Sequence, residues 1–196
     1  MRPELDHAVQ RLRNLWQNID AMERQRIADA KCDVLTEFGR YFHPETLHVL
    51  TKEQFRHFLH IKHNRHWRSL ERTRLVVSDH IGKLRNALSL LVDENKSIKE
   101  RFDRLMPHDR PGQIRYLNRG VLTPILQVAY PDKYGVWNTI SEHGMKAVSA
   151  WPTIPLKASS GDRYYQINEN LQYLARELGI DLWTLDVLWT KKALYP

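Results

Sequence analysis

The stretch that decides the fold of this chain is GVLTPILQVAYPDKYGVWN, which runs from Gly120 to Asn138. It is the longest mostly apolar run in the sequence, and its first twelve residues carry no charge. Thr123 and Pro124 fit the N-cap and the first position of a helix that continues to Tyr130. A short helix that is apolar nearly all round is typical of a protein interior. We therefore expect this helix to be buried, with the rest of the chain organised around it.

Helical periodicity extends through the N-terminal part of the chain. Apolar residues recur at three- and four-residue steps from Leu5 to Phe42, as they do on one face of an α-helix. This periodicity therefore predicts one long helix or a helix pair over residues 3–42. The polar stretch 21–31 is where we expect any break between the two.

Short polar signals mark helix ends elsewhere. Thr51 and Gln54 have the spacing of a capping box, in which each side chain bonds to the backbone amide of the other residue. Gly179 is placed to end one helix, and Asp181 is placed to cap the apolar helix that follows. No stretch alternates polar and apolar residues as a β-strand does. The predicted class is all-α.

Length and composition favour a single compact multi-helix domain. The chain has 196 residues, of which 42% are hydrophobic, and this is enough for one core. We divide the chain into an N-terminal helical segment, residues 1–42, and a compact helical domain, residues 43–196. The two parts can also form one domain. The single cysteine, Cys32, excludes an internal disulfide and suits the reducing cytoplasm. No apolar run reaches the roughly 18 residues of a membrane helix, and no signal peptide is visible, so we expect a cytoplasmic protein without a membrane partner.

Positive charge is concentrated in two segments. The formal net charge is +7 and the pI is about 9.6. The first segment, Arg56 to Arg74, holds six cations and one acid, and the second, Arg110 to Arg119, holds three arginines and no acid. The second segment directly precedes the apolar stretch, where a turn that contacts an anion would lie. This distribution favours a polyanion as partner.

Nucleic acid is the polyanion that these side chains fit best. Arginine forks match phosphate oxygens, and a ring among them can stack on a base. The alternative is a solvated cationic face, with Trp67 in the core. The residues predicted to bind nucleic acid are Arg56, Lys62, Arg65, Trp67, Arg68, Arg72, Arg110, Arg115 and Arg119.

Motifs for catalysis or metal binding are missing from the sequence. There is no P-loop, no dinucleotide-binding glycine motif and no nucleophile elbow. Four histidines are spaced three residues apart, at His57, His60, His63 and His66. On one continuous helix each step of three residues falls about 60° short of a full turn, so the four side chains would spread over about half of the circumference. They would then point in different directions and would not share one ion. We predict no metal site, no cofactor and no catalytic residue.

Several short motifs resemble a little-characterised helical domain. They are Asn64-Arg65-His66-Trp67, the run from Tyr130 to Asn138, Tyr164 to Asn168, and Asp181 to Asp186. The domain is associated with bacterial restriction and phage-defence proteins, including those built around McrB-type ATPases. The resemblance covers roughly residues 40 to 190, and it implies a place in such a system.

A second, more distant resemblance concerns the same central stretch. A glycine turn, a short apolar helix and then Pro-Asp-Lys-Tyr is similar to the second half of helix-hairpin-helix DNA glycosylases. In that family the position resembling Asn138 carries an aspartate that assists base excision. Asn138 cannot take a proton, and Lys133 alone does not restore the pattern. This resemblance implies a DNA-facing helical architecture, and it does not extend to the residues of excision chemistry.

These observations predict a non-catalytic nucleic-acid-binding domain, with DNA as its ligand. One alternative is a DNA-processing enzyme of glycosylase-like or restriction type. Another is a protein-interaction module of a defence complex, which would dock a protein partner through the aromatic C-terminus at Trp183, Trp189 and Tyr195.

Overall fold

The computed structural model describes residues 2–73, 77–106 and 114–195. All regular elements in these ranges are helical, which confirms the all-α prediction. The α-helices are α1 (Asp6–Gln17), α2 (Ala21–Phe38), α3 (Lys52–Leu59), α4 (Ile61–Asn64), α6 (Ile81–Val92), α7 (Ile98–Leu105), α8 (Arg119–Ala129), α9 (Thr139–Ala147), α10 (Ser160–Leu178) and α11 (Leu182–Leu188). The 3-10 helices are η1 (Pro3–Leu5), η2 (Gly39–Tyr41), η3 (Leu47–Val49), η4 (Arg68–Thr73) and η5 (Lys192–Leu194). None of the described helices has both the length and the apolar character needed to cross a membrane.

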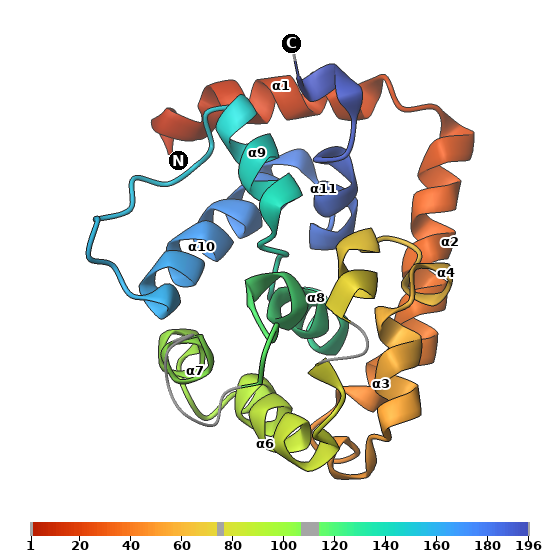
Figure 1. The fold of residues 1–196 in the computed structure, drawn as a ribbon. Helices are drawn as coiled ribbons and strands as arrows, with labels where there is room; N and C mark the ends of the chain where they lie inside the picture. The colour runs from red at the N-terminus through yellow and green to blue at the C-terminus, as the bar shows by residue number, and fades with distance from the viewer. Residues whose placement is uncertain (1, 74–76, 107–113, 196) are drawn as a thin grey trace.

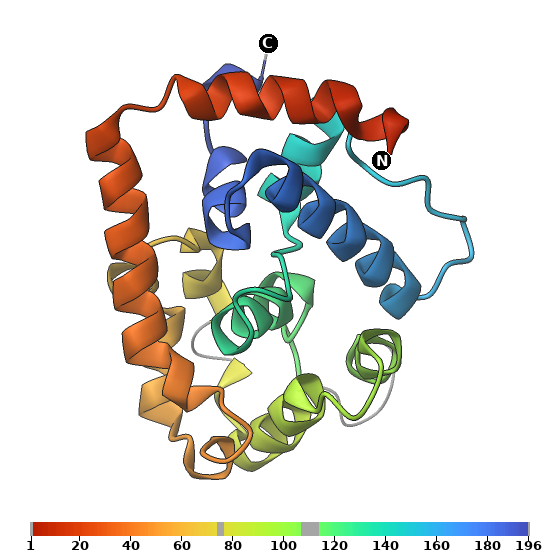
Figure 2. The same cartoon turned by 180° about the vertical axis from the view of Figure 1, so that it is seen from behind.

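The N-terminal helices form two sides of the molecule. Helix α1 lies across one end and α2 runs along the adjoining side (Figures 1 and 2). The break between them lies just before the predicted stretch, because Asp20 accepts a hydrogen bond from the Glu23 amide at 2.8 Å and so caps α2. Leu12 and Val34 belong to the same core as Leu126 of α8. Residues 1–42 and 43–196 therefore share one hydrophobic core.

Helix α8 occupies the centre, as the sequence predicts (Figure 1). Its residues from Val121 to Val128 are all buried. The predicted start at Pro124 is wrong, because α8 begins at Arg119, where the Asn118 side chain accepts a hydrogen bond from the Gly120 amide at 3.0 Å. Pro124 therefore lies inside the helix. Proline has no backbone N–H, so Pro124 cannot donate the hydrogen bond that the Gly120 carbonyl would otherwise accept.

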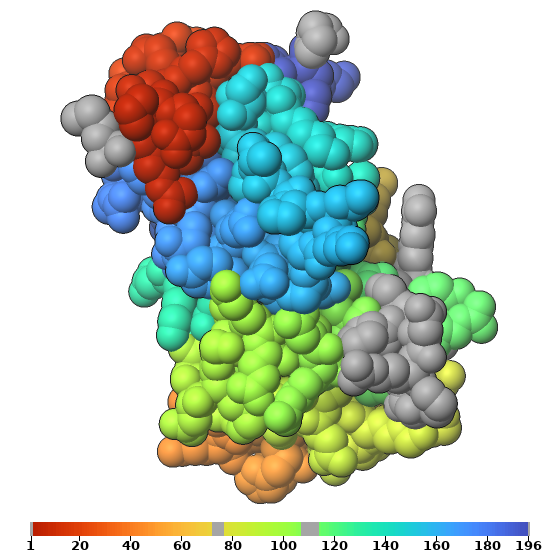
Figure 3. All heavy atoms as spheres, turned by 90° about the vertical axis from the view of Figure 1, so that its left-hand side faces the viewer, coloured from red at the N-terminus to blue at the C-terminus, as the bar shows by residue number. Residues whose placement is uncertain are grey.

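Helices α7 and α10 pack against each other, with α10 above α7 (Figures 1 and 3). The Phe102 and Tyr164 rings stack with their centroids 4.2 Å apart. A methyl group at position 161 would overlap the backbone of Lys99. Glycine is therefore required at the start of α10, because it lets the two backbones touch.

A buried arginine ties α7 to the loops around it. Arg101 is buried, donates to the Leu91 carbonyl at 2.7 Å and pairs with Glu94 at 2.8 Å. Glu94 also accepts hydrogen bonds from Lys133 and from the Tyr134 hydroxyl. Burial by itself would raise the pKa of Glu94, but these hydrogen bonds and the charge of Arg101 outweigh it and hold the pKa below its ordinary value.

Candidate nucleic-acid interface

The two arginine-bearing segments meet at one pocket. Helix η4, from the first segment, packs against α8, whose first residue is the last arginine of the second segment. A cavity of about 400 Å³ lies between η4, α8 and α9. Its lining includes Ser69, Asn118, Arg119, Asn138 and Ile140. Segments that are about 40 residues apart in sequence thus contribute to one concave surface.

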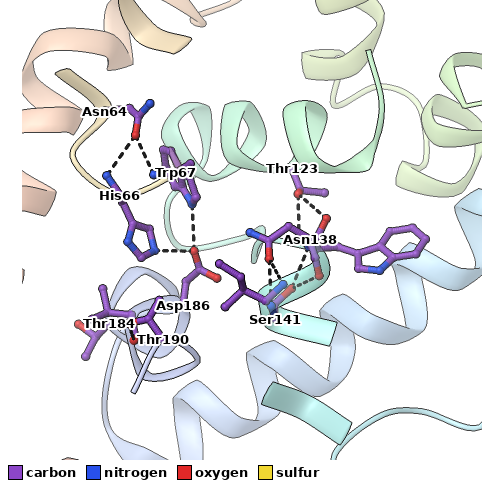
Figure 4. Close-up of polar contacts among 12 residues, drawn as sticks. Asn64, His66, Trp67, Thr123, Asn138, Ser141, Thr184, Asp186 and Thr190 are labelled. Carbon is purple, nitrogen blue, oxygen red and sulfur yellow. Dashed lines mark hydrogen bonds and ion pairs between the residues drawn. The ribbon is translucent and has the colours of Figure 1, made fainter. Parts of the chain in front are cut away.

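A polar network holds the chain in place just before η4 (Figure 4). The Asn64 side-chain oxygen accepts hydrogen bonds from the amides of His66 and Trp67, at 3.1 and 2.7 Å. The same two residues reach α11, where one carboxylate oxygen of Asp186 lies 2.8 Å from His66 Nε2 and 3.0 Å from Trp67 Nε1. Asp186 is 4% exposed. These bonds position Arg68, the next residue in the chain.

A second network holds the start of α9 on the other side of the pocket (Figure 4). The Trp137 amide donates to the Thr123 hydroxyl of α8 at 2.9 Å. The Asn138 side-chain oxygen accepts from the amides of Ile140 and Ser141, at 2.8 and 2.9 Å. The Ser141 hydroxyl accepts from the Asn138 amide at 2.9 Å and closes a capping box. Asn138, which resembles the glycosylase aspartate in position, is here a helix cap.

Three of the predicted cations are tied to carboxylates. Arg65 pairs with Asp33 at 2.9 Å and Arg119 pairs with Glu142 at 3.1 Å. Arg56 donates to the Ser78 hydroxyl at 2.7 Å and lies 3.7 Å from Asp79. These arginines are partly exposed, and ion pairs at such sites contribute only about 0–1 kcal/mol, so a phosphate can compete for them.

Three others have no such partner. Lys62, Arg68 and Arg115 are exposed, and no carboxylate of the described residues pairs with them. The Arg115 guanidinium lies over the Tyr116 ring, 4.8 Å from its centroid. Arg72 lies on η4 with its side chain outside the described part of the chain. Arg110 lies outside the described residues altogether.

Trp67 does not provide a stacking surface. It is 3% exposed, and its ring packs edge-on against Trp183, with centroids 5.1 Å apart. Its place in the core corrects the prediction that it stacks on a base. Tyr116 is the exposed ring in this region, at 43% exposure and in the left-handed conformation with φ 67°. The signal for Tyr116 in the sequence is its position directly after Arg115.

Two of the three C-terminal aromatic residues are buried. Trp183 and Trp189 belong to the core, and Tyr195 alone is exposed among them. The predicted docking surface for a protein partner at the C-terminus therefore lacks both of its tryptophans. Trp183 packs against the Trp67 ring, and Trp189 packs against Gly144 of α9.

The four histidines do not lie on the one continuous helix that the prediction of no metal site assumed. Helix α3 ends at Leu59, and His60 is extended, with φ −82° and ψ 128°, before α4 begins. The four histidines do not share one helix, and the rings of His57 and His63 stack on each other instead. Burial lowers the pKa of His63, and the neighbouring His57 lowers it further.

Comparisons of this chain with models of known families, with curated proteins and with solved structures found no match. The two resemblances given above therefore stay predictions.

Proposed function

We propose that this protein is a nucleic-acid-binding domain whose ligand is DNA and whose interface centres on the pocket between η4, α8 and α9. Arg68, Arg115 and Arg119 contact phosphates, and Tyr116 replaces Trp67 as the stacking ring. The outer cations Arg56, Lys62 and Arg65 extend the positive surface. The observation that carries the proposal is the meeting of both arginine-bearing segments at one cavity.

The starts of α8 and α9 support an anionic ligand at this pocket. Each helix carries a partial positive charge at its N-terminus, and both N-termini line the cavity. Their caps are Asn118 and Asn138, which are neutral. An aspartate in either position would add a negative charge and repel a phosphate, whereas asparagine caps the helix and keeps the positive potential.

The ion pairs of the predicted cations also support a DNA interface at this pocket. Arg119 lies 3.1 Å from Glu142, but Lys146 also bonds to this carboxylate, at 2.6 Å. Lys146 can therefore stay with Glu142 when Arg119 turns to a phosphate. Arg68 and Arg115 have no described carboxylate to leave, so they bind a phosphate without breaking an ion pair.

Salt dependence of DNA binding tests the proposal. Fluorescence anisotropy with labelled single-stranded and duplex DNA, at several salt concentrations, gives the slope of log K against log salt. We expect a slope of about −0.9 per phosphate contacted on duplex DNA. The double variant Arg68→Gln/Arg115→Gln removes two contacts and should make the slope shallower by about 1.8. The matched control is Arg26→Gln/Arg176→Gln, which removes two charges from exposed arginines on α2 and α10.

Two outcomes would reject the proposal. One is the absence of measurable binding at low salt to either form of DNA. The other is an equal loss of affinity in Arg68→Gln/Arg115→Gln and in Arg26→Gln/Arg176→Gln, which would mean that only net charge matters. A role in bacterial restriction or phage defence is the wider part of the proposal and rests on the resemblance alone.

A further inference from the structure

A carboxylate and two imidazoles meet where α2, α3 and α4 pack together. Glu37 belongs to the last turn of α2, His57 to α3 and His63 to α4. Glu37 Oε1 lies 2.5 Å from His57 Nε2. The rings of His57 and His63 are 3.6 Å apart between centroids and inclined by 27°. One ligand atom from each residue lies within 4.8 Å of the other two.

We propose that Glu37, His57 and His63 bind one divalent transition-metal ion, with zinc as the preferred metal. Two histidines and one glutamate form a donor set that binds zinc through three protein ligands and leaves a fourth position for water. The site shares no residue with the pocket between η4, α8 and α9.

The distances permit this coordination with small movements. Zinc lies about 2.0–2.2 Å from nitrogen and oxygen ligands, so tetrahedral ligand atoms are about 3.3 Å apart. The ligand atoms lie within 4.8 Å of one another, so the most distant pair has to approach by about 1.5 Å, whereas Glu37 Oε1 and His57 Nε2, now 2.5 Å apart, have to separate by about 0.8 Å. His57 Nε2 already lies beside the carboxylate, so it is chiefly the His63 imidazole that has to turn out of the stack. The existing bond between Glu37 and His57 already places two of the three donors together.

Access and neighbours also favour an ion at this position. The side chains of Glu37 and His57 are both 39% exposed, so an ion can enter from solvent and keep a water ligand. His60 lies beside His63 but is turned away, with its Nε2 3.5 Å from Glu71. Its other nitrogen accepts from the Lys62 amide and caps α4. His60 thus has a separate role, which explains why the site has two histidines and not three.

Isothermal titration with Zn²⁺ tests the site, using the full chain after removal of metals by a chelator. We expect one ion per chain. His63→Gln and Glu37→Gln should each weaken the affinity by about tenfold or more, since even residues that only orient a ligand change affinity by about 10–100-fold. The matched control is His48→Gln, an exposed histidine on η3, which should bind as the unaltered chain does.

A spectroscopic measurement keeps the test independent of whether the variants fold. Long-range ¹H–¹⁵N spectra of the unaltered chain report each imidazole, and Zn²⁺ should shift the signals of His57 and His63. Shifts confined to other histidines would overturn the proposal. So would the absence of binding at millimolar Zn²⁺, or equal affinities in His63→Gln and the unaltered chain.

Discussion

Replacing Asp186 with alanine tests the packing of α11 against the segment before η4. Asp186 is buried, and one of its oxygens receives both His66 Nε2 and Trp67 Nε1. A hydrogen bond to a charged group contributes about 1.5–3 kcal/mol to stability. Trp67 is buried too, so its N–H cannot turn to water. We expect Asp186→Ala to lower the free energy of unfolding by about 3–5 kcal/mol.

The asparagine variant separates charge from geometry. Because both donors bond to the same oxygen, the carbonyl oxygen of Asp186→Asn can accept both of them. Hydrogen bonds to a charged acceptor are about twice as strong as neutral ones. The asparagine variant should therefore lose about half as much stability as the alanine variant, or about 2 kcal/mol.

Urea unfolding, followed by tryptophan fluorescence and by far-UV circular dichroism, gives these free energies. Asp132→Ala, at an exposed position, is the control and should stay within about 0.5 kcal/mol of the unaltered chain. A double-mutant cycle with Trp67→Phe should give a coupling energy of about 1–2 kcal/mol. The reasoning is refuted if Asp186→Ala costs less than about 1 kcal/mol, or if the effects of Asp186→Ala and Trp67→Phe simply add.

Two further predictions concern α7 and its surroundings. Gly161→Ala places a methyl group against the Lys99 backbone and should lower the free energy of unfolding by about 2–3 kcal/mol or more. Thermal unfolding measures this loss. An unchanged melting temperature would contradict the close packing of α10 on α7. The depressed pKa of Glu94 contributes stability that is fully present above the ordinary value of 4.5 and is lost as pH falls through the lower folded value. Glu94→Gln should thus be less stable than the unaltered chain at neutral pH, yet it should lose less stability on acidification below pH 4.5. Urea unfolding at several pH values from 2.5 to 7 measures both effects. If the stability of the two proteins falls in parallel with pH, Glu94 does not have the depressed pKa.

Local interactions are the part of this structure that could be predicted from the sequence. The capping box between Thr51 and Gln54 is present, with both of its hydrogen bonds. Gly179 has the left-handed φ of 66° at the end of α10, and Asp181 caps α11 by accepting from the Thr184 amide at 2.7 Å. These features join residues no more than five positions apart. The residue types at those positions are therefore enough to specify them.

One local prediction failed for a physical reason. A proline is most favourable in the first turn of a helix, so Pro124 indicated a helix start. Helix α8 begins at Arg119 because Asn118 caps it, and the buried surface of α8 outweighs the one hydrogen bond that Pro124 removes. Tertiary packing thus overrode a local preference.

The sequence by itself determined the helical class, the central buried helix and the two clusters of positive charge, because periodicity, caps and composition depend on near neighbours. Only the tertiary structure decided that residues of both segments line one pocket, that Trp67 lies in the core, and that His57 and His63 stack beside Glu37. Each of these facts depends on the distance between residues that are far apart in the chain or separated by a helix break. Such distances are set by how helix faces pack in three dimensions, and periodicity along one helix does not report them.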